Sequence, residues 1–310
     1  MPPASPSSNL PLRGQVSEAD IRLLRIFKTV VDCGGFSAAE VELNISRAAI
    51  SIAIADLEKR LGLRLCQRGR GGFALTDEGA EVHTAALQVL SALESFKTHV
   101  NALHAQLKGE LNIGITDNLV TMPHMRITHA LAALKQRGAE VRINIHMLPP
   151  NEIEIAVLDG RLQIGIIPEL RPLPSLNYLP LYTEEALLYC SQQHPLFDGD
   201  DQQLNDKTLA KVDAVLPAYA QTADIKALQQ CLKASATATD REGIAFLILT
   251  GCFIGYLPTH YAELWVNQGA MRPLAPERYR YQTGYFAVTR KGDRPHLVLE
   301  TYLQELERTG

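Results

Sequence analysis

The chain has 310 residues, about twice the size of a common single domain, so its length favours two domains. Hydrophobic residues make up 46% and charged residues 21%, a composition that excludes a disordered or fibrous chain. No apolar run reaches the roughly 18 residues that a membrane helix needs, and the first residues lack an apolar signal core. Five scattered cysteines without a CxxC pair argue against a disulfide framework and a zinc site. We therefore expect a cytoplasmic protein with no metal and no cofactor.

The charges are unevenly distributed along the chain. The net charge is −4, but residues 44–75 carry six Lys or Arg against two Asp or Glu. A short basic segment on an acidic protein indicates a polyanion site confined to one region. The alternative is a solvated charged face, and charge alone favours that alternative.

The first part of the chain predicts a tail followed by a helix-turn-helix. Residues 1–16 are rich in Pro and Ser and lack periodicity, so we expect a disordered tail. A helix begins at Ser17, where an acidic residue three positions on completes a variant capping box, and a short helix covers residues 37–43. After a tight turn, Ser46 is the expected N-cap of a third helix that runs to about Leu61.

The third helix separates into two faces when its residues are placed about 100° apart. A two-stranded hairpin with a basic, glycine-rich tip follows over residues 63–75, which is the pattern of a wing. We therefore expect a winged helix-turn-helix domain over residues 17–75. The inward stripe of the third helix is Ile50, Ile54, Leu57 and Leu61. Its outward face is Arg47, Ala48, Ser51, Ile52, Ala55, Glu58 and Lys59.

A long helix is expected over residues 76–107. Its apolar positions are spaced alternately by four and three residues, which favours pairing with a partner helix over packing against its own domain. We expect this linker helix to dimerise the protein. The apolar positions are Val82, Ala86, Val89, Leu93, Phe96, Val100, Leu103 and Leu107.

From residue 108 to residue 310 the pattern changes to alternating strands and helices. It predicts an α/β domain with largely parallel sheets, large enough for two lobes. In such domains ligands lie at the carboxyl ends of strands. Helices are expected at 119–136 and 150–159 and from Pro295 onward. Strands are expected at 111–115, 141–147, 162–167, 178–182, 186–191, 214–216, 254–257 and 284–289.

Residues 24–79 closely resemble the DNA-binding half of LysR-type transcriptional regulators. The segments that carry the resemblance are GGFSAAEVELNISRAAIS, IADLEKRLGLRLCQR and ALTDEG, in the order and spacing of the family pattern. Residues 109–114, 194–196 and 251–258 are similar to landmarks of the family's effector domain. The resemblance implies a winged helix-turn-helix, a dimerising linker helix and a two-lobed α/β effector domain like that of periplasmic binding proteins. It also implies a homodimer or a tetramer of two dimers, with double-stranded DNA, a small-molecule effector and RNA polymerase as partners.

The resemblance places the third helix in the major groove and the helix starts and wing on phosphates. Ser46 then serves both as an N-cap and as a phosphate contact, whereas Arg68 has a salt bridge as its alternative role. The family usually has Gln where Arg47 stands and polar residues around Ile52. We therefore expect Ile52 or Ala48 to contact a thymine methyl, and Arg47 to bind a guanine or a phosphate. The expected DNA-binding residues are Ser37, Ser46, Arg47, Ala48, Ala49, Ser51, Ile52, Arg68 and Arg70.

The resemblance also places the effector in a cleft between the lobes, against loops that follow strands. A carboxylate at Asp117 stabilises the start of a helix but repels an anionic ligand. One hypothesis is an effector that is neutral, hydroxylated or cationic at that end. The other, equally favoured, is that Asp117 is an N-cap turned away from the ligand. The expected effector-binding residues are Thr116, Asp117, Asn118, Leu119, Met147, Leu148, Ile167, Pro168, Leu216, Pro217 and Ala218.

Other classes of function have less support. We expect no catalytic residues, because the sequence has no Gly-x-Ser-x-Gly elbow, no His-Glu-x-x-His and no phosphate-binding Walker loop. A cytoplasmic small-molecule-binding protein would leave the basic winged segment unexplained. A thiol redox sensor of the same fold would need cysteines that meet, and Cys190, Cys231 and Cys252 are far apart in sequence. The sequence therefore predicts an effector-modulated, DNA-binding transcriptional regulator.

Overall fold

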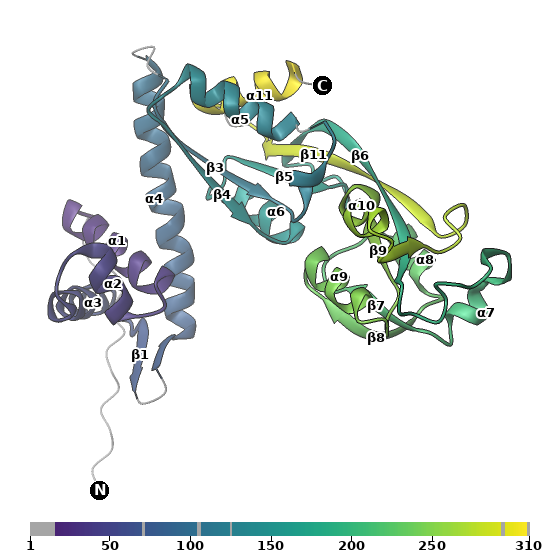
Figure 1. Ribbon diagram of the computed structural model, residues 1–310. Coiled ribbons are helices and arrows are strands. Elements are labelled where there is room, and N and C mark those ends of the chain that lie inside the picture. The colour runs from purple at the N-terminus through teal and green to yellow at the C-terminus, as the bar shows by residue number, and fades with distance from the viewer. Residues whose placement is uncertain (1–15, 70–71, 104–106, 125, 293–294, 309–310) are drawn as a thin grey trace, which may run out of the picture. The chain divides into compact units, whose positions relative to one another are not determined.

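The computed structural model describes residues 16–69, 72–103, 107–124, 126–292 and 295–308 (Figure 1). The chain divides into two compact units, residues 1–94 and residues 95–310. All but the last residue of the expected tail lie outside the described residues, as do Arg70 at the wing tip and residues 104–106 of the expected linker helix. In the part of the chain that is described, no helix is both long and apolar enough to cross a membrane.

The first unit folds as a helix-turn-helix followed by a hairpin. The expected capping box is present at the start of α1, where the Ser17 backbone and hydroxyl both donate to the Asp20 carboxylate at 2.7 Å. Asn44 lies in the left-handed region with φ 52°, which gives the tight turn between α2 and α3, and Gly62 ends α3 with φ 67°. The elements are α1 (Glu18–Asp32), α2 (Phe36–Leu43), α3 (Arg47–Leu61), β1 (Cys66–Gly69) and β2 (Gly72–Leu75).

The core of this unit confirms the inward stripe of α3. Ile50, Ile54 and Leu57 are almost fully buried, and Leu61 packs against the same core. Phe27 and Val30 of α1 meet them there. Because these apolar residues are used inward, the opposite face of α3 is left for solvent or a partner.

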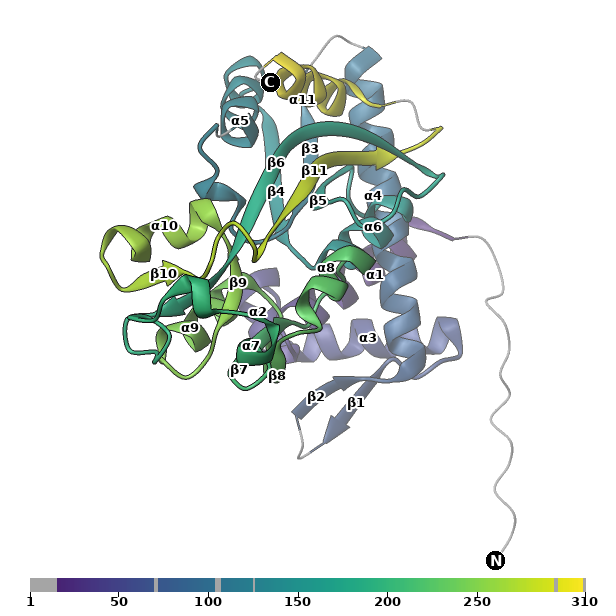
Figure 2. The same cartoon turned by 90° about the vertical axis from the view of Figure 1, so that its right-hand side faces the viewer.

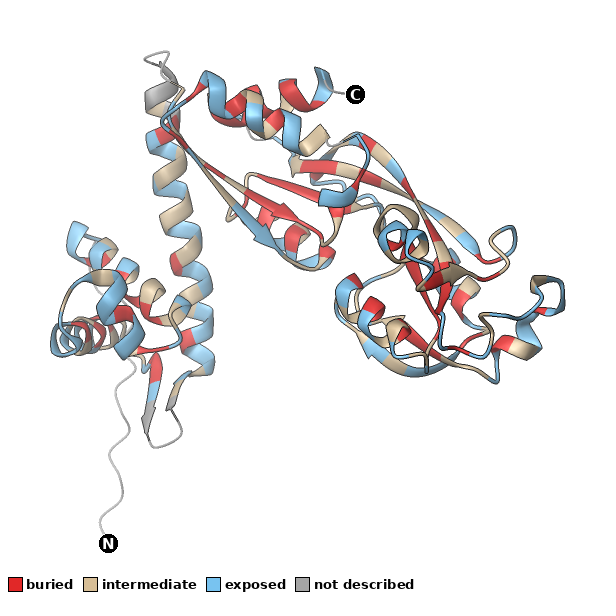
Figure 3. Ribbon diagram, in the orientation of Figure 1, coloured by how far each residue is buried: buried red, intermediate tan, exposed pale blue. Residues whose placement is uncertain are grey.

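The long helix α4 (Asp77–Leu103) is continuous in Figure 1 and starts in the first unit. Thr76 caps it, since its hydroxyl accepts a hydrogen bond from the Gly79 backbone at 2.9 Å. Three positions of the expected apolar stripe are open to solvent: Val89 is 40% exposed, Leu93 38% and Phe96 68%. Figure 3 shows the same helix mostly in the colours of exposed and intermediate residues.

The second unit is built on a seven-stranded sheet with the order β10-β6-β11-β5-β3-β4, in which β9 also pairs with β6. A smaller sheet pairs β7 with β8. The strands of the large sheet are β3 (Gly109–Ile115), β4 (Val141–Met147), β5 (Ile164–Pro168), β6 (Leu176–Ser191), β9 (Gly255–Pro258), β10 (Met271–Pro273) and β11 (Arg280–Arg290). Those of the small sheet are β7 (Asp213–Pro217) and β8 (Lys233–Ala238).

The expectation of largely parallel sheets is wrong for the large sheet. β3 is parallel to β4 and β5, but β11 is antiparallel to β5 and β6, and β6 is antiparallel to β9 and β10. The first lobe of this unit contains β3, β4 and β5, and the second contains β7, β8, β9 and β10. The reason for the mixed sheet is that β6 and β11 are long strands that run through both lobes. One half of β6 belongs to the sheet of the first lobe, and the other half pairs with β9 and β10 in the second lobe.

Three local expectations also differ from the structure. The two strands expected at 178–182 and 186–191 are one strand, β6, because the polar residues between them stay in the ladder with β11. The helix expected from residue 119 is a single 3-10 turn, η1 (Leu119–Thr121), followed by α5 (Arg126–Arg137). Pro123 accounts for this break, because it holds Met122 in an extended conformation. Strand β8 was not expected.

Helices cover the sheets of both lobes (Figures 1 and 2). In the first lobe α5 and α11 (Leu297–Arg308) pack side by side over one core cluster, and α6 (Pro150–Leu158) packs over a second. The strands of this sheet show many buried residues in Figure 3. The second lobe holds η2 (Asp201–Gln203), α7 (Asp206–Leu209), α8 (Ala223–Gln229), α9 (Arg241–Leu249) and α10 (Thr259–Asn267).

Candidate DNA interface and effector cleft

The outward face of α3 is exposed except at Ser51 and at Glu58, whose carboxylate accepts hydrogen bonds from the backbones of Leu65 and Cys66. Arg47, Ala48 and Ala49 form its first turn and are open to solvent, and Ile52 is 63% exposed one turn on. Ser51, between them, is partly buried. The N-terminal part of α3 thus presents an arginine, small residues and an exposed isoleucine. This combination suits a helix that binds base edges in the major groove of DNA.

The two helix starts carry exposed hydroxyls. Ser46 is the N-cap of α3, and its hydroxyl accepts a hydrogen bond from the Ala49 backbone at 3.3 Å. Ser37 is exposed in the first turn of α2, which has Gly35 as its N-cap. Backbone N–H groups at helix starts can hold phosphate oxygens.

The wing is present as the antiparallel pair β1 and β2, with Cys66 opposite Leu75. Arg68 lies in β1 opposite Phe73, but its side chain is outside the described residues, as is Arg70. Cys66 is buried in the core of the unit.

In the second unit, a buried polar cluster lies where the two lobes meet, and Arg241 at the start of α9 is its centre. The Arg241 guanidinium donates to Glu184 Oε1 at 2.8 Å and to the Tyr285 hydroxyl at 2.6 Å. It also donates to the backbone carbonyl of Asp117 at 3.0 Å, and the Arg241 backbone N–H donates to Asp117 Oδ2 at 2.6 Å. The Arg241 side chain of α9 thus contacts the loop after β3 and the two long strands β6 and β11.

A histidine extends this cluster to the other carboxylate oxygen. His260 of α10 bonds Glu184 Oε2 through Nε2 at 3.0 Å and Thr121 Oγ1 through Nδ1 at 2.6 Å. The side chain of Glu184 is 2% exposed and that of His260 is 6% exposed. A buried carboxylate is stable in a protein when it is paired in this way.

Tyrosines lie around the Arg241 guanidinium. Burial lowers the pKa of Arg241, but Tyr285 and Glu184 raise that pKa more, so the guanidinium stays charged. Burial raises the pKa of Tyr219 to about 12, and the charges of Arg241, Asp117 and Glu184 also act on this phenol. The hydroxyls around the cluster are therefore neutral hydrogen-bonding groups at physiological pH.

The Asp117 carboxylate lies in this cluster and away from the start of the next helical turn. It is not an N-cap of η1, which starts after Asn118. It reaches instead to the first residue of α9 in the other lobe, and the Asn118 amide also donates to it at 2.9 Å. Thr116 beside it is 2% exposed, and its hydroxyl is among the buried polar atoms that lack a partner in the described structure.

The remaining residues expected to bind the effector are spread over several places. Leu119 and Ile167 are buried in the core clusters of the first lobe, and Leu148 packs against one of them. Met147 ends the edge strand β4 and is 58% exposed. The others lie at strand ends: Pro168 ends β5, Leu216 and Pro217 end β7, and Ala218 follows β7.

Sequence reasoning missed Glu184, Arg241, His260, Thr121 and Tyr285. Glu184 was missed because the polar pair Glu184-Glu185 inside an apolar stretch resembles a break between two strands. Arg241 had a usable signal, since Asp240 caps α9 directly after β8, but β8 itself was not recognised. The contacts of His260 and Thr121 join residues 139 positions apart, and no local pattern predicts such contacts.

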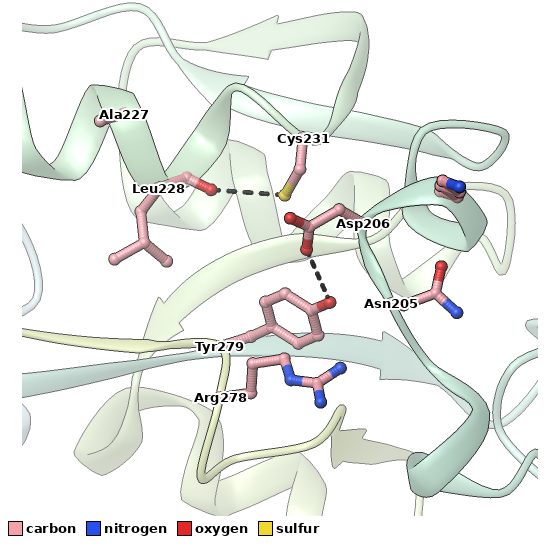
Figure 4. A pocket seen from close by; sticks show the side chains of 8 residues that line it. Asn205, Asp206, Ala227, Leu228, Cys231, Arg278 and Tyr279 are labelled. Atoms are coloured by element: carbon pink, nitrogen blue, oxygen red, sulfur yellow. Dashed lines mark hydrogen bonds between the residues drawn. The ribbon is translucent and has the colours of Figure 1, made fainter.

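A cavity lies in the second lobe and shares no residue with the cluster (Figure 4). Its volume is about 740 Å³, and it lies between α7, the end of α8 and the segment before β11. The Tyr279 hydroxyl donates to Asp206 at 3.0 Å, and the Cys231 thiol donates to the Leu228 carbonyl at 3.4 Å. Arg278 lies beside Tyr279 in the same wall.

None of the five cysteines forms a disulfide bond. All five are free thiols. Burial raises the pKa of Cys190 to about 11 and also raises that of Cys231, so both thiols are protonated and weakly nucleophilic. No group of three or more metal-ligating side chains occurs among the residues that the structure describes.

A helix-turn-helix with an exposed third helix, joined to a two-lobed α/β domain with a buried polar cluster where the lobes meet, defines a ligand-responsive DNA-binding protein. Residues 21–80 match the family model of bacterial regulatory helix-turn-helix proteins of the lysR family, and residues 104–310 match the LysR substrate binding domain. The chain belongs to the LysR family of bacterial transcriptional regulators. It therefore combines a DNA-binding domain with an effector-binding domain, and its partners are DNA, a small-molecule effector and further copies of itself.

Individual relatives agree with this assignment. The transcriptional activator BauR of Pseudomonas aeruginosa is 60% identical over 96% of this chain and 97% of that protein. The probable transcriptional regulator LrrA of Synechococcus elongatus is 32% identical over 65% of this chain and 66% of that protein. Among solved structures, full-length CbnR in complex with its target DNA covers 93% of this chain and 99% of that chain, with a TM-score of 0.66 and 17% identity. That last likeness shows the shared fold.

Proposed function

We propose that this protein is a transcriptional activator that works in the cytoplasm and has no catalytic activity of its own. The observation that carries the proposal is the 60% identity to the activator BauR, which extends over both the DNA-binding and the effector-binding domains. An activator of this kind binds an operator through α3 and the wing, and it responds to an effector in the cleft between the lobes.

Capture of genomic fragments by the purified protein tests the DNA-binding part. Fragments are sequenced after binding at low and at moderate salt, and a reporter is placed behind each enriched site. We expect enriched sites with dyad symmetry that survive moderate salt, and reporter output that rises when the protein is present. Binding that is uniform across sequences and disappears with salt would mean phosphate contacts alone, and a fall in output would mean repression.

Within the DNA interface, we propose that Arg47 binds a base. It is exposed in the first turn of α3. We expect Arg47→Ala to weaken operator binding by about 1–3 kcal/mol and to relax specificity at one position. Fluorescence anisotropy with the operator and its point variants measures both effects. Arg22→Ala on the exposed part of α1 is the matched control, and normal operator binding by the Arg47 variant would contradict the assignment.

Within the cleft, we propose that the effector is neutral, hydroxylated or cationic where it meets Asp117. The support is the Asp117 carboxylate, which lies beside the buried Thr116 hydroxyl at the end of β3. We expect Asp117→Asn to lower effector affinity roughly tenfold, the loss of about 1.4 kcal/mol expected when a hydrogen bond to a charge becomes neutral. Calorimetric titration with the effector that activates the reporter measures this change. Unchanged affinity would remove Asp117 from the site.

A further inference from the structure

Two hydrogen-bonded bridges cross from the first lobe to the second, and both end on one carboxylate. In the first bridge, the loop after β3 reaches α9 through Asp117 and Arg241, at 2.6 Å between Oδ2 and the backbone nitrogen. In the second, η1 reaches α10 through Thr121 and His260, at 2.6 Å between Oγ1 and Nδ1. Arg241 and His260 each bond a different oxygen of Glu184.

Glu184 makes the two bridges parts of one assembly. It lies in the middle of β6, the strand that runs through both lobes, and its neighbour in space is Tyr285 of β11. Its charge is balanced only while Arg241 stays in place, since its side chain is 2% exposed, and His260 adds a hydrogen bond to the other oxygen. Hydrogen bonds between buried groups are stronger than surface bonds, and an unpaired buried charge is costly.

The members of the cluster differ in how easily a ligand reaches them. The Asp117 side chain is 31% exposed and Thr121 is open to solvent, whereas Arg241 is 10% exposed. The first-lobe ends of both bridges are therefore accessible, and the second-lobe ends are enclosed. A donor group that enters the cleft meets Asp117 before it meets Arg241.

We propose that these bridges form a latch that holds the two lobes together before the effector binds, and that the effector acts by replacing Arg241 as the partner of Asp117. This inference rests on the proposed function of the cleft. A ligand shifts a conformational equilibrium only through its different affinities for the two states, and the latch supplies that difference. Loss of either bridge moves the equilibrium toward separated lobes without any effector.

Distance measurements in the full-length, effector-free protein test the latch. Spin labels are attached to cysteines at two exposed positions, Asn151 on α6 and Gln268 after α10, and labelled subunits are diluted with unlabelled ones. Serines replace the native cysteines that are not buried, which are Cys33, Cys231 and Cys252. The variants are Asp117→Ala, Thr121→Val and their combination. Thr121→Val removes one hydroxyl at an exposed site, so it keeps the test decisive if the Asp117 variant folds poorly.

We expect one distance in the parent protein and a second, longer distance in the variants. The ratio of open to closed lobes should rise about tenfold for each bridge removed. Asp201→Asn is the matched control, because it breaks a 2.8 Å ion pair with Arg272 inside the second lobe and should leave the distances unchanged. A parent-like distribution in the Thr121→Val variant and the double variant would overturn the latch. Because neither DNA nor effector is present, that result would leave the proposed function standing, whereas a failed effector titration would count against the cleft.

Discussion

At the scale of single residues, close contact with the backbone explains why residue 79 is a glycine. Gly79 is the last residue of the segment ALTDEG and lies in the first turn of α4. A Cβ atom there would lie 2.0 Å from the carbonyl oxygen of Leu65, a distance that no side chain tolerates. Thr76 bonds the carbonyl of Arg64 and the backbone of Gly79, so these bonds fasten the start of α4 to the segment before the wing.

A buried histidine gives the second unit a pH dependence with a defined sign. His194 is 5% exposed, its Nδ1 accepts a hydrogen bond from the Leu196 backbone at 3.1 Å, and burial lowers its pKa. The unfolded chain takes up this proton near pH 6.5, roughly, and the folded chain only at lower pH. The stabilisation is thus complete above that pH and is lost as pH falls, by up to about 1.4 kcal/mol per pH unit.

The substitution His194→Asn tests this pH dependence, because an amide oxygen can accept the same hydrogen bond without titrating. Urea unfolding between pH 7 and pH 5 should show a smaller loss of stability in the variant than in the parent. Equal losses in both proteins would show that other groups carry the pH dependence. The parent protein at pH 8 serves as the reference, because His194 is neutral there in both the folded and the unfolded chain.

At the scale of elements, the spacing of apolar residues predicts the buried face of a helix correctly. Polar residues inside a strand lead to a wrong prediction of where the strand ends. The buried stripe of α3 could be predicted, because residues three and four apart share a helix face whatever lies around them. The continuity of β6 could not, because Glu184 is tolerated there only through Arg241 and His260, which come from distant parts of the chain. The outward face of α3 follows from one helix and could be predicted from the sequence. The polar cluster is assembled from segments far apart in the chain, so Asp117 is its one member among the residues expected at the effector site.

The exposed stripe of α4 predicts how the protein assembles. Phe96 is 68% exposed in the unit that contains it, and Val89 and Leu93 continue the stripe. A charge at Phe96 would be buried without a partner in a helix pair. We expect Phe96→Asp to raise the dissociation constant of the dimer by roughly 30-fold or more, about 2 kcal/mol. Sedimentation velocity over a range of concentrations measures this. Gln88→Asp, exposed but off the stripe, is the control, and equal assembly of both variants would place the interface elsewhere.

At the scale of the whole molecule, the chain consists of two compact units with separate hydrophobic cores. The core of the first unit is formed by α1, α2, α3 and the hairpin, and the clusters of the second unit contain none of those residues. Multidomain proteins of this kind do not unfold in a single two-state step. DNA binding and effector binding therefore draw on cores that can be perturbed one at a time.

Two matched glycine substitutions test this independence by calorimetry at a fixed protein concentration. In Gly79→Ala the new methyl meets the Leu65 carbonyl of the first unit, and in Gly165→Ala it would lie 2.3 Å from Ile153 Cγ2 in the second. Each substitution should cost about 1–3 kcal/mol through overpacking. We expect each variant to lower one transition and leave the other in place. For the same loss of unfolding free energy, the melting temperature should fall further in the smaller first unit, because a small domain has a smaller entropy of unfolding. A single transition lowered by both variants would mean that the units unfold together. In that case the long helix α4 couples their stabilities as well as joining them.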